Sequence, residues 1–193
     1  AFALGLRHAG IGSAVTRGEV GAAIAGNGAE FAVLGAPDSI AWLLNMRGGD
    51  IPNTPVALCY AVVACDGGVE LFIDRRKLSP ELLDAFDDGI TIRLPEDLGP
   101  ALDTLGASGR RVLVDPATAP SWFSNRLESA GAGIIREGDP CAPLKACKNE
   151  AELDGTRAAH VRDGASLCRF LAWLARTAPD GGVSEISAAE QLY

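Results

Sequence analysis

The stretch that decides the fold is VALCYAVVACDGGVELFI, residues 56–73. An apolar run, 56–64, is followed by Asp66-Gly67-Gly68 and then by a second apolar run, 69–73. Asp-Gly between two apolar runs is a strong signal for a β-hairpin. The two runs therefore predict neighbouring antiparallel strands, and a sheet that contains them is not wholly parallel.

On both sides of this hairpin, helical patterns alternate with short apolar runs. Pro and Ser mark several helix starts, as in Ser79-Pro80, where Ser suits the N-cap and Pro the first helical position. The alternation predicts an α/β domain with a mixed sheet flanked by helices. The further strands are expected at 31–34, 90–94, 111–114 and 133–135, and the helices at 14–25, 37–44, 79–86, 95–105 and 119–130.

The character of the chain changes after the connector GDPCAP, residues 138–143. Beyond it the pattern is helical without strands: residues 149–175 form one long helix or two abutting ones, and a last helix starts at Ser184. We therefore expect one domain over 1–143 and a second over 144–193. Because the last helix is cut at Tyr193, the chain is expected to be a piece of a longer protein.

Composition excludes several classes of partner. The chain is 48% hydrophobic with a formal net charge of -8, which argues against nucleic acid, whose binding needs a basic stripe, and disfavours an anionic membrane surface. No apolar run approaches the roughly 18–20 residues of a membrane span. The number of cysteines is odd and no pair has CxxC spacing, which predicts free, buried thiols and a cytoplasmic protein. They are Cys59, Cys65, Cys141, Cys147 and Cys168.

Residue types that could perform catalysis are scarce. The chain has two histidines, His8 and His160, and neither HExxH nor GxSxG occurs. A structural role explains both histidines better than a catalytic one. Asp84, Asp87 and Asp88 are better explained as a solvated helix end than as a cation site. The residues alone therefore predict no catalytic residue and no metal ligand.

The most suggestive element is the loop of residues 45–55, which is rich in Gly and Pro and carries Asn45, Arg47 and Asp50. Binding residues often lie on such loops, and Arg can hold a carboxylate through two hydrogen bonds. An alternative of equal weight is that Arg47 and Asp50 pair with each other or with the backbone of the loop.

Two long stretches resemble one family of enzymes. DSIAWLLNMRGGDIP, residues 38–52, resembles the signature of the middle domain of three-domain aminopeptidases P, and KACKNEAELDGTRAAHVRDG, residues 145–164, resembles the segment that opens their catalytic domain. The similarity extends from about residue 30 to the end of the chain. Shorter matches lie at 71–74, 77–80, 112–115, 169–174 and 181–186.

This resemblance implies a creatinase/prolidase N-terminal-like domain followed by the first helices of a truncated pita-bread catalytic domain. The intact enzymes of the family release an N-terminal residue that precedes proline. They use two divalent metal ions, often manganese, held by two Asp, one His and two Glu. Those ligands lie beyond this sequence, and His160 does not match the metal-binding histidine. The piece itself is therefore expected to hold no cofactor and to be inactive alone.

The resemblance also places the loop Asn45–Asp50 near the substrate entrance, which makes Arg47, Asn45 and Asp50 the expected substrate-binding residues. Proline-containing peptides and a second copy in a homodimer are the expected partners. One alternative is a non-catalytic pita-bread module that binds peptides or acts as a scaffold, and the metal ligands downstream would decide it. A creatinase-like amidinohydrolase is disfavoured by the motif WLLNMRG at residues 42–48.

Overall fold

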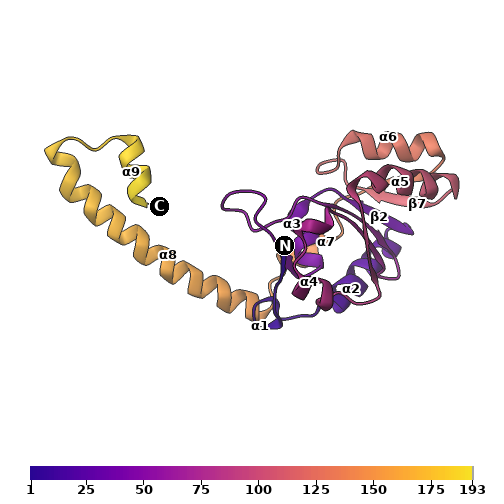
Figure 1. Cartoon of the computed structure of the whole chain (residues 1–193), viewed down its shortest axis with the longest axis horizontal. Coiled ribbons are helices and arrows are strands. Elements are labelled where there is room, and N and C mark those ends of the chain that lie inside the picture. Colours follow the sequence, from indigo (N-terminus) through magenta and orange to yellow (C-terminus); the bar gives the residue numbers. More distant parts are fainter. Residues whose placement is uncertain (193) are drawn as a thin grey trace. The chain divides into compact units, whose positions relative to one another are not determined.

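The computed structural model describes residues 1–192, which form two compact units, residues 1–148 and a second unit that begins at Asn149. All strands of the described chain belong to the first unit (Figure 1). The second unit consists of helices.

A six-stranded mixed sheet forms the centre of the first unit, with the strand order β6-β5-β4-β2-β7-β8. β4 pairs antiparallel with β5 and with β2, whereas the other neighbours are parallel. The predicted hairpin and the mixed sheet are therefore confirmed. The strands are β2 (Phe31–Leu34), β4 (Tyr60–Ala64), β5 (Val69–Phe72), β6 (Ile90–Arg93), β7 (Arg111–Val114) and β8 (Gly133–Arg136).

Two hydrophobic clusters lie in this unit because successive side chains of a strand point to opposite faces of the sheet. The larger cluster contains Ile24, Ile40 and Cys141 from the helices and Leu71 from β5. Its helices are α2 (Ser13–Gly26), α3 (Pro37–Leu43), α4 (Pro80–Ala85) and α7 (Cys141–Ala146).

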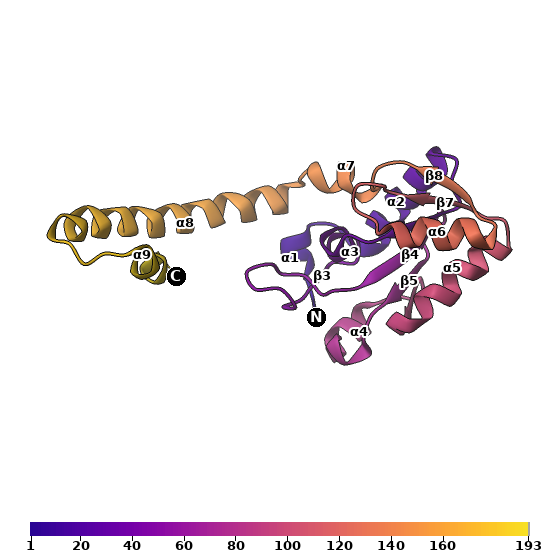
Figure 2. The same ribbon diagram turned by 90° about the horizontal axis from the view of Figure 1, so that it is seen from above.

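The second cluster lies on the other face, where α5 (Leu98–Ala107) and α6 (Ser121–Ala130) lie side by side (Figures 1 and 2). Leu102 and Leu127 pack there against residues of β2 and β7, and the cluster reaches β4 and β5 through Val62 and Phe72. None of its buried residues comes from β6. On this face the two helices therefore cover one half of the sheet and leave the half at β6 open.

Several short elements depart from the expectation. The strand expected over 56–64 begins only at Tyr60, because residues 56–58 are bonded to the loop before them. A two-stranded sheet pairs β1 (Phe2–Ala3) with β3 (Met46–Arg47), inside a stretch expected to be loop throughout. A short helix, α1 (Leu6–Ala9), precedes α2, and α7 begins within the expected connector. Three 3₁₀ turns, Arg75–Lys77, Pro95–Asp97 and Ala178–Asp180, complete the described elements.

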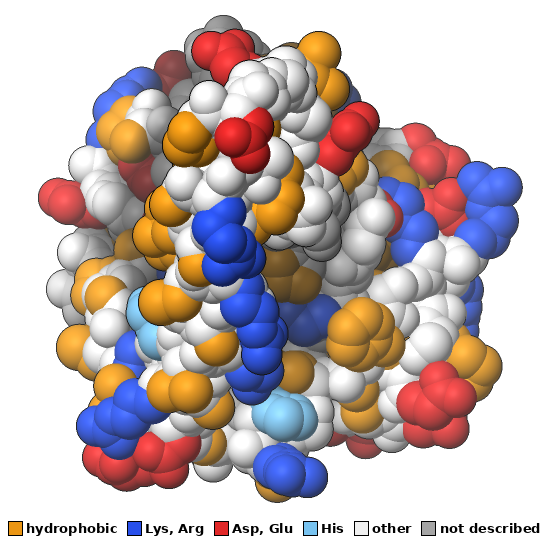
Figure 3. Space-filling model, turned by 90° about the vertical axis from the view of Figure 1, so that its left-hand side faces the viewer, with side chains coloured by type: hydrophobic (Ala, Val, Ile, Leu, Met, Phe, Trp, Pro, Cys, Tyr) orange, Lys and Arg blue, Asp and Glu red, His pale blue; other side chains and the backbone are white. Residues whose placement is uncertain are grey.

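The second unit contains the continuous helix α8 (Glu150–Thr177) and the helix α9 (Glu185–Leu192). A capping box starts α8: the Asn149 side chain accepts from the Glu152 amide, and the Glu152 carboxylate accepts from the Asn149 amide. No described residue of this unit is buried. Hydrophobic side chains and a row of basic side chains both reach the surface on the side shown in Figure 3, and the basic residues of the second unit are all arginines. Within residues 1–192, no helix has the length and apolarity needed to cross a bilayer.

Candidate functional site

The loop that carries Arg47 is held in a defined shape. After β3 it turns back on itself through the amide of Gly48, which donates to the Pro55 carbonyl, and the amide of Asp50, which donates to Val56 (both 3.2 Å). Asn53 lies at the tip with φ 60. In Figures 1 and 2 the segment after β3 extends away from the rest of the domain. The loop therefore presents an exposed tip on an ordered base.

Gly48 permits the close approach of the two sides of this loop. A Cβ atom at this position would lie 2.6 Å from the Ala57 amide nitrogen, which is far inside van der Waals contact. At Gly49 a Cβ atom would meet nothing within 4 Å. The shape of the loop therefore depends on glycine at position 48 and not at position 49.

Asn45 connects the start of the chain to the junction between α3 and β3. Its backbone is in the left-handed region, with φ 47, which Asn tolerates better than most residues. Its Nδ2 donates to the Ile11 carbonyl at 2.7 Å, and its own carbonyl accepts from the Leu4 amide at 2.6 Å. The structure thus gives Asn45 a clear positioning role.

Arg47 is half-buried against the end of α3. Its Nη1 donates to the carbonyls of Ala41, at 3.1 Å, and Met46, at 2.8 Å. Ala41 belongs to the last turn of α3, where carbonyls lack helical partners and a cation is favourable. This geometry fixes the guanidinium beside the base of the loop.

Asp50 is tied to a different part of the domain. Its Oδ2 accepts from Lys77 Nζ at 2.6 Å and from the Leu58 amide at 2.9 Å. The hydrogen bond from Lys77, followed by that from Leu58, lowers the pKa of this carboxyl below its ordinary value. Asn45, Arg47 and Asp50 thus share one loop, but their side chains bind to the segment before α2, the end of α3 and the turn at Lys77, respectively.

The other residues considered for catalysis do not form a reacting centre. His8 is exposed on α1, and Nδ1 of His160 lies 2.9 Å from the Thr156 carbonyl of its own helix. Throughout residues 1–192, no three His, Cys, Asp or Glu side chains come close enough to hold a metal ion.

Asp84, Asp87 and Asp88 are all exposed, as expected for a solvated helix end, but Asp87 also binds a buried arginine. Both its carboxylate oxygens accept from Nη2 of Arg17, at 2.6 and 2.5 Å, and Nη1 of Arg17 donates to the Gly67 carbonyl. The side chain of Arg17 is 6% exposed. Asp87 therefore balances a buried guanidinium that joins α2 to the β4–β5 turn, a partner that local sequence could not reveal.

The prediction of buried thiols is correct for two of the five cysteines. All five are free, but only Cys59 and Cys141 are buried, and burial raises the pKa of Cys59 to about 12. The pKa of Cys141 is likewise raised, first by burial and then by Asp139. These two thiols are core residues, because the thiolate needed for nucleophilic attack is disfavoured there.

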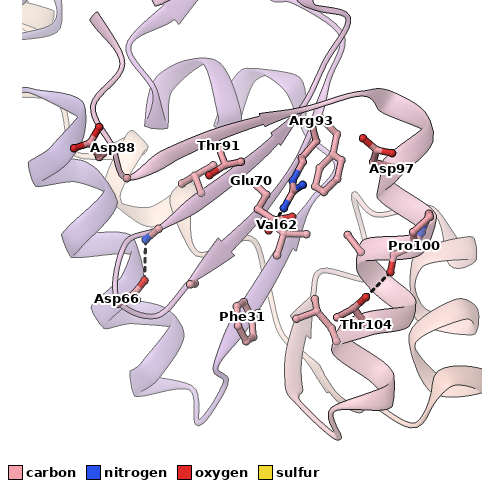
Figure 4. A pocket seen from close by; sticks show the side chains of 17 residues that line it. Phe31, Val62, Asp66, Glu70, Asp88, Thr91, Arg93, Asp97, Pro100 and Thr104 are labelled. Atoms are coloured by element: carbon pink, nitrogen blue, oxygen red, sulfur yellow. Dashed lines mark hydrogen bonds and ion pairs between the residues drawn. The ribbon is translucent and has the colours of Figure 1, made fainter.

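Sequence reasoning missed a groove of about 600 Å³ on the open half of the sheet (Figure 4). Its floor is formed by β4, β5 and β6, and one wall is formed by α5. The alternation of polar and apolar residues along β5 and β6 is the signal that could have indicated an open face. The charged and polar side chains in its lining are Asp66, Glu70, Asp88, Thr91, Arg93, Asp97 and Thr104.

The sequence and the fold are both similar to those of known peptidases. A "Probable Xaa-Pro aminopeptidase P" of Trichophyton verrucosum is 33% identical over 172 residues, which cover 83% of this chain and 24% of the relative. "Aminopeptidase P2" of Arabidopsis thaliana is 31% identical, over 86% of this chain and 27% of its own length. The chain thus spans about a quarter of the length of these curated relatives.

Among solved structures, the X-prolyl aminopeptidase of Caenorhabditis elegans, described as a cytosolic enzyme with a di-nuclear active site, superposes with a TM-score of 0.86 at 26% identity. The match covers 98% of this chain and 32% of that enzyme. The Xaa-Pro dipeptidase of Bacillus anthracis, 15% identical with a TM-score of 0.68, shares the fold. Residues 1–152 match the Creatinase/Prolidase N-terminal domain, and the chain therefore belongs to this family.

Proposed function

We propose that the chain is part of a metal-dependent Xaa-Pro aminopeptidase and contains its creatinase-type domain and the first helices of its catalytic domain. The observation that carries this proposal is the extent of the similarity to the Caenorhabditis elegans enzyme. With 98% of the chain covered, that similarity continues past residue 152 into α8 and α9. We propose the domain boundary near residues 143 and 144, and the two compact units of the structure divide between Lys148 and Asn149.

The exposed apolar side chains of the second unit agree with this proposal. Leu167 and Leu171, on one face of α8, are 48% and 51% exposed, and Ile186 of α9 is 73% exposed. Amphipathic helices in proteins gain most of their stability by packing their apolar face. Since the chain covers a third of the Caenorhabditis elegans enzyme, we infer that the rest of a catalytic domain covers these residues.

Two divalent metal ions, manganese in our proposal, would belong to the longer protein. The residues of this chain do not fit such a pair, because no three metal-ligating side chains converge within the described part. The ligands would have to come from sequence outside residues 1–193, and no catalytic step is assigned to this chain. We propose that it shapes the approach of the substrate.

The loop of Asn45, Arg47 and Asp50 is the part of this chain that we assign to substrate binding. Its base is fixed by hydrogen bonds, so the loop can hold a peptide at low entropic cost. We propose that proline-containing peptides pass this loop in a cytoplasmic, homodimeric enzyme. In that setting Arg47 orients the peptide from the base of the loop.

The proposal is tested with a peptide that begins Arg-Pro-Pro. We expect the 193-residue chain to leave it intact and the longer protein, loaded with Mn²⁺, to release the first residue. In the longer protein, Arg47→Ala should raise KM about tenfold and change kcat less, because the residue positions substrate without touching the reacting atoms. Arg75→Ala, at an exposed position outside the loop, is the control. Metal-dependent cleavage by the chain alone would contradict the proposal, and peptide binding without cleavage by the longer protein would indicate a non-catalytic module.

A further inference from the structure

The groove beside α5 has the dimensions of a missing helix. Neighbouring strands lie about 4.8 Å apart, so β4, β5 and β6 together present a surface about 10 Å wide. An α-helix with its side chains is about 10–12 Å in diameter. The opposite face of the same strands is covered by helices, and α5 and α6 cover the other half of this face. The groove is therefore a place where one more helix completes the layer.

The floor of the groove is apolar at its centre. The apolar side chains that are accessible in it are Phe31 of β2 and Pro100 and Leu105 of α5, whereas Val62 and Phe72 beneath them are 5% and 1% exposed. Figure 4 shows Phe31 and Val62 on the strands opposite Pro100 and Thr104 of α5. A helix that binds here can bury an apolar stripe against these side chains.

The polar lining of the groove carries a surplus of negative charge. The lining contains four carboxylates, those of Asp66, Glu70, Asp88 and Asp97, but a single guanidinium, that of Arg93. Nη2 of Arg93 lies 3.4 Å from the Glu70 carboxylate, its one ion-pair partner in the described chain.

The other three carboxylates have no cationic partner among the described residues. Asp66 and Asp97 accept only backbone amides, of Gly68 at 2.9 Å and of Leu94 at 3.2 Å, and Asp88 has no partner within residues 1–192. The complementary surface is therefore one that supplies Lys or Arg beside apolar side chains.

From this shape and charge we infer that the groove binds a basic amphipathic helix supplied by another polypeptide segment. The apolar stripe of that helix packs on Phe31, Pro100 and Leu105, and its flanking Lys or Arg residues face Asp88 and Asp97. This inference stands apart from the proposed peptidase function, since the loop at Arg47 contributes no residue to the groove lining.

The probe is a fluorescent, acetylated and amidated peptide of Leu and Lys in helical register, about 14 residues or roughly 20 Å of helix. We measure its anisotropy with the full 193-residue chain at low salt. Asp88→Lys combined with Thr91→Lys places two cations in the groove at exposed positions, and it should weaken binding at least about tenfold. Asp84→Lys is the control, because it also replaces an exposed Asp by Lys, but on α4 outside the groove. It should alter the affinity by less than about twofold. Circular dichroism checks that every variant is folded.

Hydrogen exchange locates the peptide. Protection is expected in β5, β6 and α5, and a matched peptide with Glu in place of Lys should give no binding and no protection. The inference is overturned if the Asp88→Lys, Thr91→Lys variant binds the Lys peptide as tightly as the Asp84→Lys variant. It is also overturned if the peptide protects the apolar face of α8 and not the groove. It is also overturned if the chain without peptide self-associates and protects β5 and β6, since a second copy would then occupy the groove.

Discussion

The two units of the chain are built in different ways. In the first, large side chains such as Phe72, Leu102 and Phe123 are almost completely buried between a sheet and its helices. In the second, α8 is one of the longest elements, yet none of its residues is buried. The comparison teaches that the first unit contains the partners that define its fold, whereas the second has helical signals in its sequence but few partners in this chain.

The largest expected effect tests this difference directly. Leu102→Ala removes a side chain that is 0% exposed from the cluster under α5 and should lower the free energy of unfolding by about 2–5 kcal/mol. Urea denaturation of the 193-residue chain, followed by tryptophan fluorescence and circular dichroism, measures it. Leu171→Ala is the matched substitution in α8, where the side chain is 51% exposed, and should cost less than about 0.5 kcal/mol. Equal losses of unfolding free energy from Leu102→Ala and Leu171→Ala would contradict the difference between the two units.

A smaller effect is expected at the loop after β3, which is exposed like α8 but held by tertiary contacts. Gly48→Ala should destabilise the first unit by about 1–3 kcal/mol, because its Cβ would collide with the backbone at Ala57. Gly49→Ala, where a Cβ meets nothing within 4 Å, should change stability by less than about 0.5 kcal/mol. Urea midpoints of the two variants give the measurement. If Gly48→Ala left the urea midpoint unchanged, the close packing at Ala57 would not contribute to the stability of the first unit.

The smallest expected effect concerns Asp50, whose carboxyl pKa in the folded state is lowered by Lys77 and the Leu58 amide from an ordinary value of 3.8. Because the folded pKa is the lower one, the contribution of this carboxylate is complete above the ordinary pKa and is lost as pH falls through the folded value. Asp50→Asn should therefore cost less than about 1 kcal/mol at neutral pH, since the pair lies near the surface.

The check is the difference in stability between Asp50→Asn and the unsubstituted chain across a pH series. This difference should decline as pH falls below 3.8. A difference that grows on acidification would contradict the assigned sign.

Much of the fold follows from local sequence. The Asp-Gly turn predicts the β4–β5 hairpin, and Ser79-Pro80 and Asn149 mark helix starts that the structure confirms. The errors occur where tertiary contacts overrule a local pattern. The apolar residues at 56–58 look like the beginning of a strand, but their backbone is bonded to the loop at Asp50. The two-residue strands β1 and β3 are too short to leave a periodic signal.

The candidate site could be predicted less completely. The resemblance identified the loop of Asn45, Arg47 and Asp50, and whether these residues bind substrate stays a prediction. Their hydrogen-bond partners, such as Lys77 for Asp50, are distant in sequence, so spacing could not reveal them. The groove was missed for the same reason, because it exists only where α5 leaves β6 uncovered.

The position of β2 has a consequence for the order in which the chain acquires its structure. This strand pairs with β4, about 30 residues downstream, and with β7, about 80 residues downstream. During synthesis, which proceeds from the N-terminus, β2, β4, β5 and β6 are available before β7 exists. One edge of β2 then stays unpaired until β7, its parallel neighbour, has been synthesised. Such nonlocal pairing is slow, and an unpaired strand edge can pair with another chain, so we expect this edge to be open to aggregation while the chain emerges.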